Sequence, residues 1–161
     1  MRKELVPPPG GKLTPLLIEK KEELKNLLAR ASELKSVSLN SKSESDVIML
    51  ATEAYSPFPG FMGNSDYVAV RDHMRVSNEL LWHIPVTLPV SSQIAKRLRV
   101  GKAISLVSQD TNQIMAVMTI DEIYDYDKDQ EAEGVFATRD TSHPGVAKIY
   151  KQNGIYLAGS V

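Results

Sequence analysis

The sequence contains no cysteine, which excludes a disulfide framework, a thiolate nucleophile and cysteine-bound zinc. It also lacks an excess of charge of one sign, because 19 basic and 20 acidic residues give a net charge of −1. Proteins that bind nucleic acids or membrane surfaces mainly through charge present a strongly basic surface. We therefore expect no nucleic-acid partner and no membrane partner, and we take the reducing cytoplasm as the default location.

Long apolar runs are absent as well, since no stretch reaches the ~18 apolar residues that a membrane span needs. Residues 1–11 end in prolines and glycines instead of the apolar core of a secretion signal. We interpret this opening as a surface arm without regular secondary structure. Gly10-Gly11-Lys12 is interpreted as a turn, because its surroundings do not match a phosphate-binding loop.

Apolar periodicity and capping residues predict four helices. They are expected over residues 16–34, from Ser43 (with Asp46 as its acidic partner) to near Tyr55, from Asn64 or Ser65 to Met74, and over 93–98 behind Ser91 or Ser92. Stretches rich in β-branched residues predict strands at 37–39, 84–90, 103–107, 114–120 and 155–157.

These elements predict an α+β fold with a small, mostly antiparallel sheet or barrel decorated by short helices. The strands at 103–107 and 114–120 are expected to form a hairpin, and the two prolines in 84–90 favour an edge strand. With 161 residues and 42% hydrophobic content, we expect residues 1–161 to form a single domain with one core.

No residue pattern in the sequence specifies a metal site. The histidines His73, His83 and His143 lack metal-binding spacing, and we interpret the first two as structural or surface residues. Carboxylates at alternate positions resemble the start of a calcium loop, but Gln130 and Phe136 stand where that loop requires glycine and glutamate. We interpret the whole acidic run as a solvated helix entrance, with Asp127 or Asp129 near the helix dipole: Asp125, Asp127, Asp129, Glu131 and Glu133.

The densest polar cluster spans residues 138–145 and supplies the candidate binding residues Arg139, Asp140, Thr141 and His143. A cation, a carboxylate, a hydroxyl and an imidazole together could bind an anion or position a neighbouring segment. We favour a simpler interpretation, in which Thr141 or Ser142 caps a helix that begins near Pro144 and Arg139 pairs with Asp140.

Four segments together resemble the ATP sulfurylase family, in the order in which that family has them. Residues 46–63 (DVIMLATEAYSPFPGFMG) resemble its LATGAFSPLxGFMG segment, and residues 82–90 (WHIPVTLPV) resemble WPIPITLxV. Residues 140–146 (DTSHPGV) resemble DTAHPGV, and residues 6–17 resemble its PHGGxLxPLL opening. The resemblance runs over essentially the whole chain.

The resemblance implies a PUA-like N-terminal domain of a nucleotidyltransferase of sulfur metabolism, in sulfate assimilation or in energy metabolism, that converts ATP and sulfate to adenylyl sulfate and pyrophosphate. The family places its chemistry in a following α/β domain with QxRN and HxxH motifs, and neither motif occurs in this sequence. We therefore expect no catalytic residue and no cofactor in this chain. Departures from the family pattern occur at Pro9 (usually histidine), Ser41 and Lys42 (commonly arginine) and Arg139 (small or hydroxyl).

Three functions compete. The chain could be a non-catalytic scaffold for a sulfurylase catalytic domain or for subunit contacts, including a homo-oligomer. It could instead be a free-standing PUA-like module that binds RNA, although its neutral charge, one Trp and three Phe argue against that. The third function, an enzyme in itself, lacks an assembled nucleophile, base or metal set.

The segment 56–62 holds two prolines, a glycine and three large apolar residues that need cover. We expect Phe61 and Met62 to face the core of this domain and Phe58 to face the catalytic domain.

Overall fold

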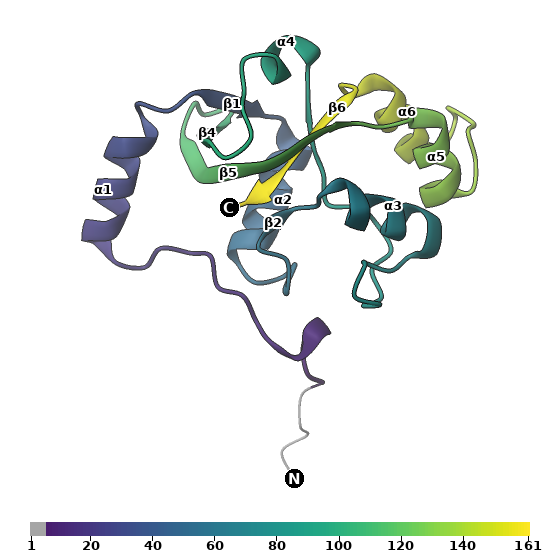
Figure 1. The fold of residues 1–161 in the computed structure, drawn as a ribbon, viewed down its shortest axis with the longest axis horizontal. Helices are drawn as coiled ribbons and strands as arrows, with labels where there is room; N and C mark the ends of the chain where they lie inside the picture. The colour runs from purple at the N-terminus through teal and green to yellow at the C-terminus, as the bar shows by residue number, and fades with distance from the viewer. Residues whose placement is uncertain (1–5) are drawn as a thin grey trace.

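The computed structural model describes residues 6–161, and it consists of one mixed six-stranded sheet with helices around it (Figure 1). The strand order is β1-β4-β5-β6-β2, and β3 also pairs with β6. The strands are β1 (Ser36–Leu39), β2 (Gly60–Phe61), β3 (Leu88–Val90), β4 (Ala103–Ser108), β5 (Ile114–Asp125) and β6 (Ile155–Ser160). The helices are a 3-10 turn η1 (Pro9–Gly11), α1 (Lys21–Ala31), α2 (Ser41–Ala51), α3 (Asn64–His73), α4 (Ser92–Ala95), α5 (Lys128–Phe136) and α6 (Pro144–Lys151). The predicted α+β class is confirmed, and the sheet stays open.

The centre of the sheet is the antiparallel run β4-β5-β6. The predicted hairpin of β4 and β5 is confirmed, with Ile104 opposite Met118. β5 continues beyond its predicted end because its second half pairs with β6, after a register shift between Ile120 and Glu122. β3 is an edge strand, as predicted, because it pairs, among the described strands, only with β6. The missing N–H of Pro89 is tolerated at such an edge. Only three residues of the predicted strand pair.

The opening segment differs from its prediction in two places. Residues 1–5 of the predicted arm lie outside the described residues, and Pro9–Gly11 forms a single 3-10 turn with φ of 74° at Gly10. The predicted helix 16–34 begins only at Lys21 and ends at Ala31. The residues before it are not helical: the Thr14 N–H donates to the Ser56 hydroxyl at 2.9 Å, and Leu16 packs against the main core.

The cap of α2 was predicted at Ser43 and lies at Asn40, whose side-chain oxygen accepts from the Ser43 N–H at 2.9 Å. Ser43 is therefore buried within the first turn. The helix ends at Ala51, and hydrogen-bonded turns carry the chain past Tyr55.

The cap of α3 comes from another element. Neither Asn64 nor Ser65 caps the helix: Gly63 is the N-cap residue, and the Asn64 N–H donates to Glu122 Oε2 on β5 at 2.8 Å. At α4 the predicted cap Ser91 is confirmed by its bond from the Ile94 N–H, although the helix ends at Ala95.

The segment 56–62 is covered by this chain itself. Phe61 and Met62 are 4% and 3% exposed, as expected for core residues. The expectation for Phe58 is wrong: it is only 9% exposed, and its ring packs edge-on against Trp82 with centroids 4.6 Å apart. The loop before β3 folds Trp82 over Phe58, which the local sequence did not indicate.

The main core lies where the sheet meets α2, α4 and segment 56–62. A separate apolar cluster between α5 and α6 holds Ala132, Val146 and Ile149. A third cluster, made of tyrosines, connects α3 to β5 and β6. Among the described residues, no helix is long and apolar enough to cross a membrane.

Candidate functional site

The predicted polar cluster 138–145 forms the connection between α5 and α6, and its charged residues are exposed. We expected Arg139 to pair with Asp140, and this expectation is wrong. The Arg139 Nε donates to Glu133 Oε2 at 2.7 Å, and another of its nitrogens lies 3.7 Å from Asp129. The guanidinium therefore bridges carboxylates of α5, because the chain turns back along that helix.

The helix cap within this cluster is His143, in place of the predicted Thr141 or Ser142. The His143 Nδ1 accepts from the Gly145 N–H at 3.2 Å, and Pro144 occupies the first helical position. Asp140 accepts from the Ser142 N–H at 2.8 Å, and this bond holds the pKa of the Asp140 carboxyl below its usual range. The polar atoms of the cluster thus organise the backbone around the start of α6.

The other sequence candidates are dispersed. His73 lies in the last turn of α3 and His83 in the loop before β3, and both are exposed. Asp127 lies at the start of α5, as predicted, and caps it by accepting from the N–H groups of Asp129 and Gln130. Within residues 6–161, no group of three or more histidine, aspartate or glutamate side chains could hold a metal ion.

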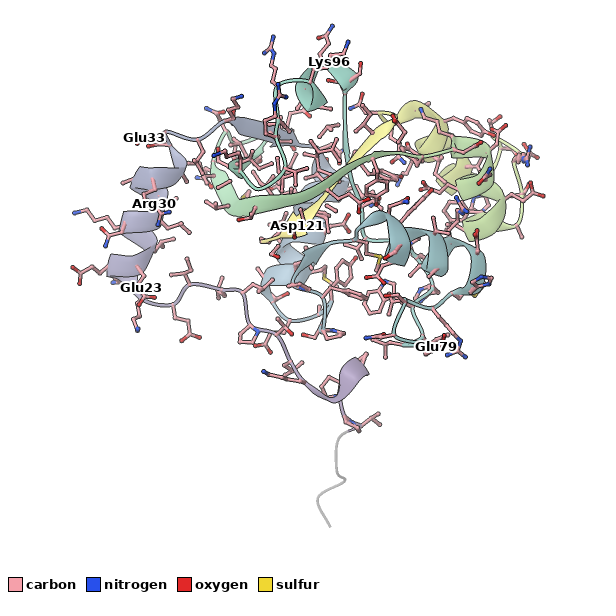
Figure 2. All side chains as sticks on the ribbon, viewed as in Figure 1. Glu23, Arg30, Glu33, Glu79, Lys96 and Asp121 are labelled. Carbon is pink, nitrogen blue, oxygen red and sulfur yellow. The ribbon has the colours of Figure 1, made fainter. Side chains whose placement is uncertain are left out.

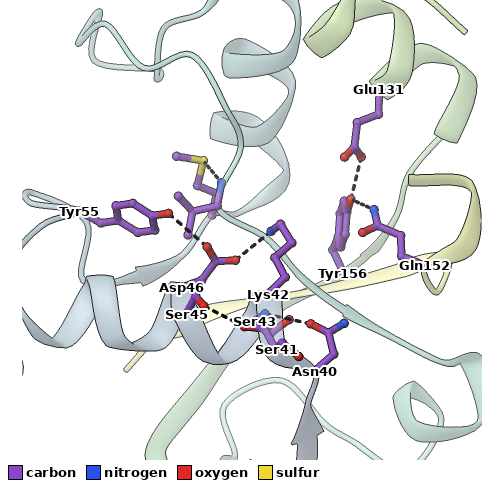
Figure 3. A network of polar contacts seen from close by, with 12 residues as sticks. Asn40, Ser41, Lys42, Ser43, Ser45, Asp46, Tyr55, Glu131, Gln152 and Tyr156 are labelled. Atoms are coloured by element: carbon purple, nitrogen blue, oxygen red, sulfur yellow. Dashed lines mark hydrogen bonds and ion pairs between the residues drawn. The ribbon is translucent and has the colours of Figure 1, made fainter. Parts of the chain in front are cut away.

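One acidic residue of the run 125–133 lies inside the molecule, which corrects its prediction as solvated. Glu131 is 6% exposed, and its Oε2 accepts from the hydroxyls of Tyr156 at 2.7 Å and Tyr67 at 3.0 Å. The Gln152 amide in turn donates to the Tyr156 hydroxyl at 2.7 Å, as Figure 3 shows. Three elements therefore meet at one carboxyl: α3, α5 and β6.

Burial is the largest influence on the Glu131 carboxyl. Burial raises the pKa of Glu131, although the hydrogen bonds from Tyr156 and Tyr67 act in the opposite direction. Burial also raises the pKa of both of these tyrosines, to which the nearby Glu131 charge adds. The tyrosines therefore stay neutral at physiological pH and act as hydrogen-bond donors.

Two further tyrosines complete this cluster. The Tyr126 ring stacks on Tyr156 with centroids 3.9 Å apart, and burial raises the pKa of Tyr126 to about 12. The Tyr124 hydroxyl donates to the Met62 carbonyl at 2.9 Å and so ties β5 to segment 56–62. The arrangement has a structural role, because each tyrosine hydroxyl donates a hydrogen bond to a different segment of the chain.

A small hollow of about 90 Å³ adjoins Glu131. Its polar lining includes Lys42, Thr87, Lys148 and Gln152, and its size suits a few water molecules at about 30 Å³ each. Lys42 also pairs with Asp46 at 2.8 Å, and Asp46 accepts from Tyr55 (Figure 3). Burial, and then the Asp46 charge, raise the pKa of Tyr55 to about 12.

Sequence reasoning missed Glu131, although a signal was present. Glu131 shares a helical face with the apolar side chain of Val135, four residues later, and precedes the fully buried Ala132. A carboxylate on the apolar face of a helix must find buried partners. The hydroxyl-bearing aromatic residues that satisfy it come from distant positions, so the sequence did not show which ones they would be.

Comparisons with known proteins agree on the nature of the chain. A family model described as a PUA-like domain matches residues 6–161. The chain is 40% identical over 157 residues to a sulfate adenylyltransferase of Desulforamulus reducens and 38% identical over 158 residues to one of a Synechococcus species. Each of these matches covers 98% of this chain and 40% of the relative, so the chain spans well under half the length of these curated relatives.

A solved structure, described as a hexameric APS kinase from Thiobacillus denitrificans, shares the fold with a TM-score of 0.66 and 26% identity. That match covers 76% of this chain and 24% of the other. The resemblance to ATP sulfurylases, which are sulfate adenylyltransferases, is thus confirmed, as is the PUA-like fold. The open mixed sheet, its surrounding helices and the match over residues 6–161 lead to one conclusion: this chain belongs to the PUA-like domain family.

Proposed function

We propose that this chain is the non-catalytic PUA-like part of an ATP sulfurylase and serves as a scaffold for the catalytic part. One observation carries the proposal: sulfate adenylyltransferases match 98% of this chain, but the match covers only 40% of their length. The remainder of those relatives is long enough to hold a catalytic domain of ordinary size. Transfer of an adenylyl group from ATP to sulfate would take place there.

The side chains of this chain support a structural role. The polar groups of the 138–145 cluster hold the backbone of the α5–α6 connection, and Glu131 is enclosed by tyrosines. Neither arrangement presents a nucleophile beside a base, which group-transfer chemistry by side chains requires. We propose that Arg139, Asp140, Thr141 and His143, which remain exposed, shape the surface that the rest of a sulfurylase contacts.

Residues 1–161 would act as one cytoplasmic unit in this proposal, and subunit contacts of a homo-oligomer are a second role for its surface. The hexameric state of the APS kinase with the same fold gives a precedent for assembly.

The RNA-binding alternative is less well supported. RNA-binding surfaces stack bases on exposed aromatic rings and neutralise phosphates with basic residues. Here Phe58 and Phe61 are buried, as are Tyr67, Tyr124 and Tyr156, and the net charge is −1. Fluorescence anisotropy with labelled RNA at physiological salt should show weak binding, whereas tight binding would favour the alternative.

The scaffold function is tested by a replacement experiment. In a fusion, this chain takes the place of the matching 157 residues of the Desulforamulus reducens sulfate adenylyltransferase. The fusion should form adenylyl sulfate and pyrophosphate from ATP and sulfate at a rate near that of the unaltered relative. An inactive but folded fusion would show that this chain does not support the catalytic part.

A further inference from the structure

An apolar groove lies between the opening segment, α1 and β5, at the edge of the main core, to which its lining residue Val47 belongs. It has a volume of about 450 Å³, and its 14 lining residues are all apolar. They come from residues 16–18, α1, α2, residues 114–117 of β5, and Val161. Figures 1 and 2 show α1 at the periphery of the molecule, standing off from the sheet and marked by Glu23 and Arg30.

The helix above this groove is poorly covered. Ala31 is the only buried residue of α1, while Leu24 and Leu28 are 42% and 40% exposed. Leu17, in the extended segment before the helix, is 63% exposed. An isolated helix of 11 residues is marginal in water, so α1 depends on contacts of its apolar face. Apolar surface gathered in this way marks an interaction site.

The lining chemistry indicates what kind of molecule the groove accepts. Small-molecule sites combine apolar walls with a few polar groups that fix the orientation of the ligand. Among residues 6–161, no polar side chain lines this groove. Its walls therefore suit the apolar face of a protein segment, which is oriented by shape and by polar contacts at the rim.

We propose that this groove is the seat of an apolar segment of the sulfurylase catalytic part, an inference that rests on the proposed function. The longer relatives all carry additional chain beside the region matched here, and domains of one chain bury roughly 600–1,500 Å² against each other. A second copy fits less well. A two-fold contact would place the same concave surface against itself and leave its hollow unfilled.

Substitutions of the exposed leucines test the groove. Leu17→Glu and Leu24→Glu introduce charges at groove positions that are 63% and 42% exposed in this chain. The thermal unfolding midpoint of the isolated chain should change by less than about 2 °C. In the Desulforamulus reducens fusion, the same substitutions would bury charges, and they should lower the midpoint of thermal inactivation by about 5 °C or more.

Leu81→Glu is the matched control, because Leu81 is 65% exposed and lies outside the groove. Equal effects of the Leu17, Leu24 and Leu81 substitutions on the fusion, or no effect of any, would overturn the groove assignment while leaving the scaffold function intact. An inactive unsubstituted fusion would count against the scaffold function itself. Sedimentation of the isolated chain as a dimer that Leu24→Glu dissolves would assign the groove to a second copy and also overturn the proposal.

Discussion

The buried carboxyl of Glu131 makes the stability of this protein depend on pH in a direction opposite to that of most carboxylates. Burial raises its pKa above the ordinary glutamate value of about 4.3. A carboxyl with a raised pKa in the folded state contributes stability that is fully present below its unfolded pKa. That contribution is lost as the pH rises through the folded pKa.

Glu131→Gln isolates this effect. The glutamine keeps an oxygen that can accept from the Tyr67 and Tyr156 hydroxyls, but it carries no charge at any pH. Its free energy of unfolding relative to the wild type should therefore increase between pH 4 and pH 8. The increase should be about 1.4 kcal/mol for each unit by which the pKa is raised.

Glu131→Ala separates the hydrogen bonds from the charge. It leaves two buried tyrosine hydroxyls without their acceptor, at a cost of roughly 1–3 kcal/mol each. Urea melts at pH 4, 6 and 8 measure all variants, and Glu133→Gln, an exposed position on the same helix, is the control. A constant difference between Glu131→Gln and the wild type at all three pH values would refute the reasoning.

Three further substitutions test the packing and capping. Phe58→Ala and Phe61→Ala should each lower the free energy of unfolding by roughly 3–5 kcal/mol in urea melts, since both rings lie in the same core; a loss below about 1 kcal/mol for Phe58 would contradict its burial. His143→Ala should cost about 0.5–2 kcal/mol and His143→Asn less, because asparagine is a good helix cap; equal losses in thermal melts would argue against the capping role. Gly145→Ala should destabilise the α5–α6 contact, because the added Cβ would overlap the Phe136 ring, and unchanged thermal stability would contradict that close approach.

The elements of the sheet could be predicted because their signals are local. β4 and β5 follow each other in an apolar pattern with a polar loop between them, and they pair as a hairpin. The paired part of the 84–90 strand is limited to Leu88–Val90, because β2 pairs with Gly159 and Ser160 further along β6, which is a tertiary constraint. Tertiary contacts also accompany the late start of α1: Leu16 packs against the main core, and Thr14 is bonded to Ser56, which lies 42 residues away.

The candidate site was harder to predict, because its contacts join distant residues. His143 caps α6, although Thr141 and Ser142 just before it are better capping residue types. Arg139 donates to Glu133 on the preceding helix and not to its neighbour Asp140. Glu131 accepts hydrogen bonds from the hydroxyls of Tyr67 and Tyr156, which lie 64 and 25 residues away in the sequence. Such pairs carry no spacing rule in a single sequence, whereas the resemblance to ATP sulfurylases rested on contiguous motifs and was visible without the structure.

The most direct test of the scaffold account is a sulfurylase assay of the isolated chain. A preparation shown to be free of host sulfurylase is supplied with ATP and sulfate, and pyrophosphate release is measured; the reverse direction is followed as ATP formation from adenylyl sulfate and pyrophosphate. The account predicts no turnover above the protein-free control in either direction, because neither the QxRN motif nor the HxxH motif of the family's catalytic domain occurs in the sequence. Robust turnover that follows the purified chain would contradict it.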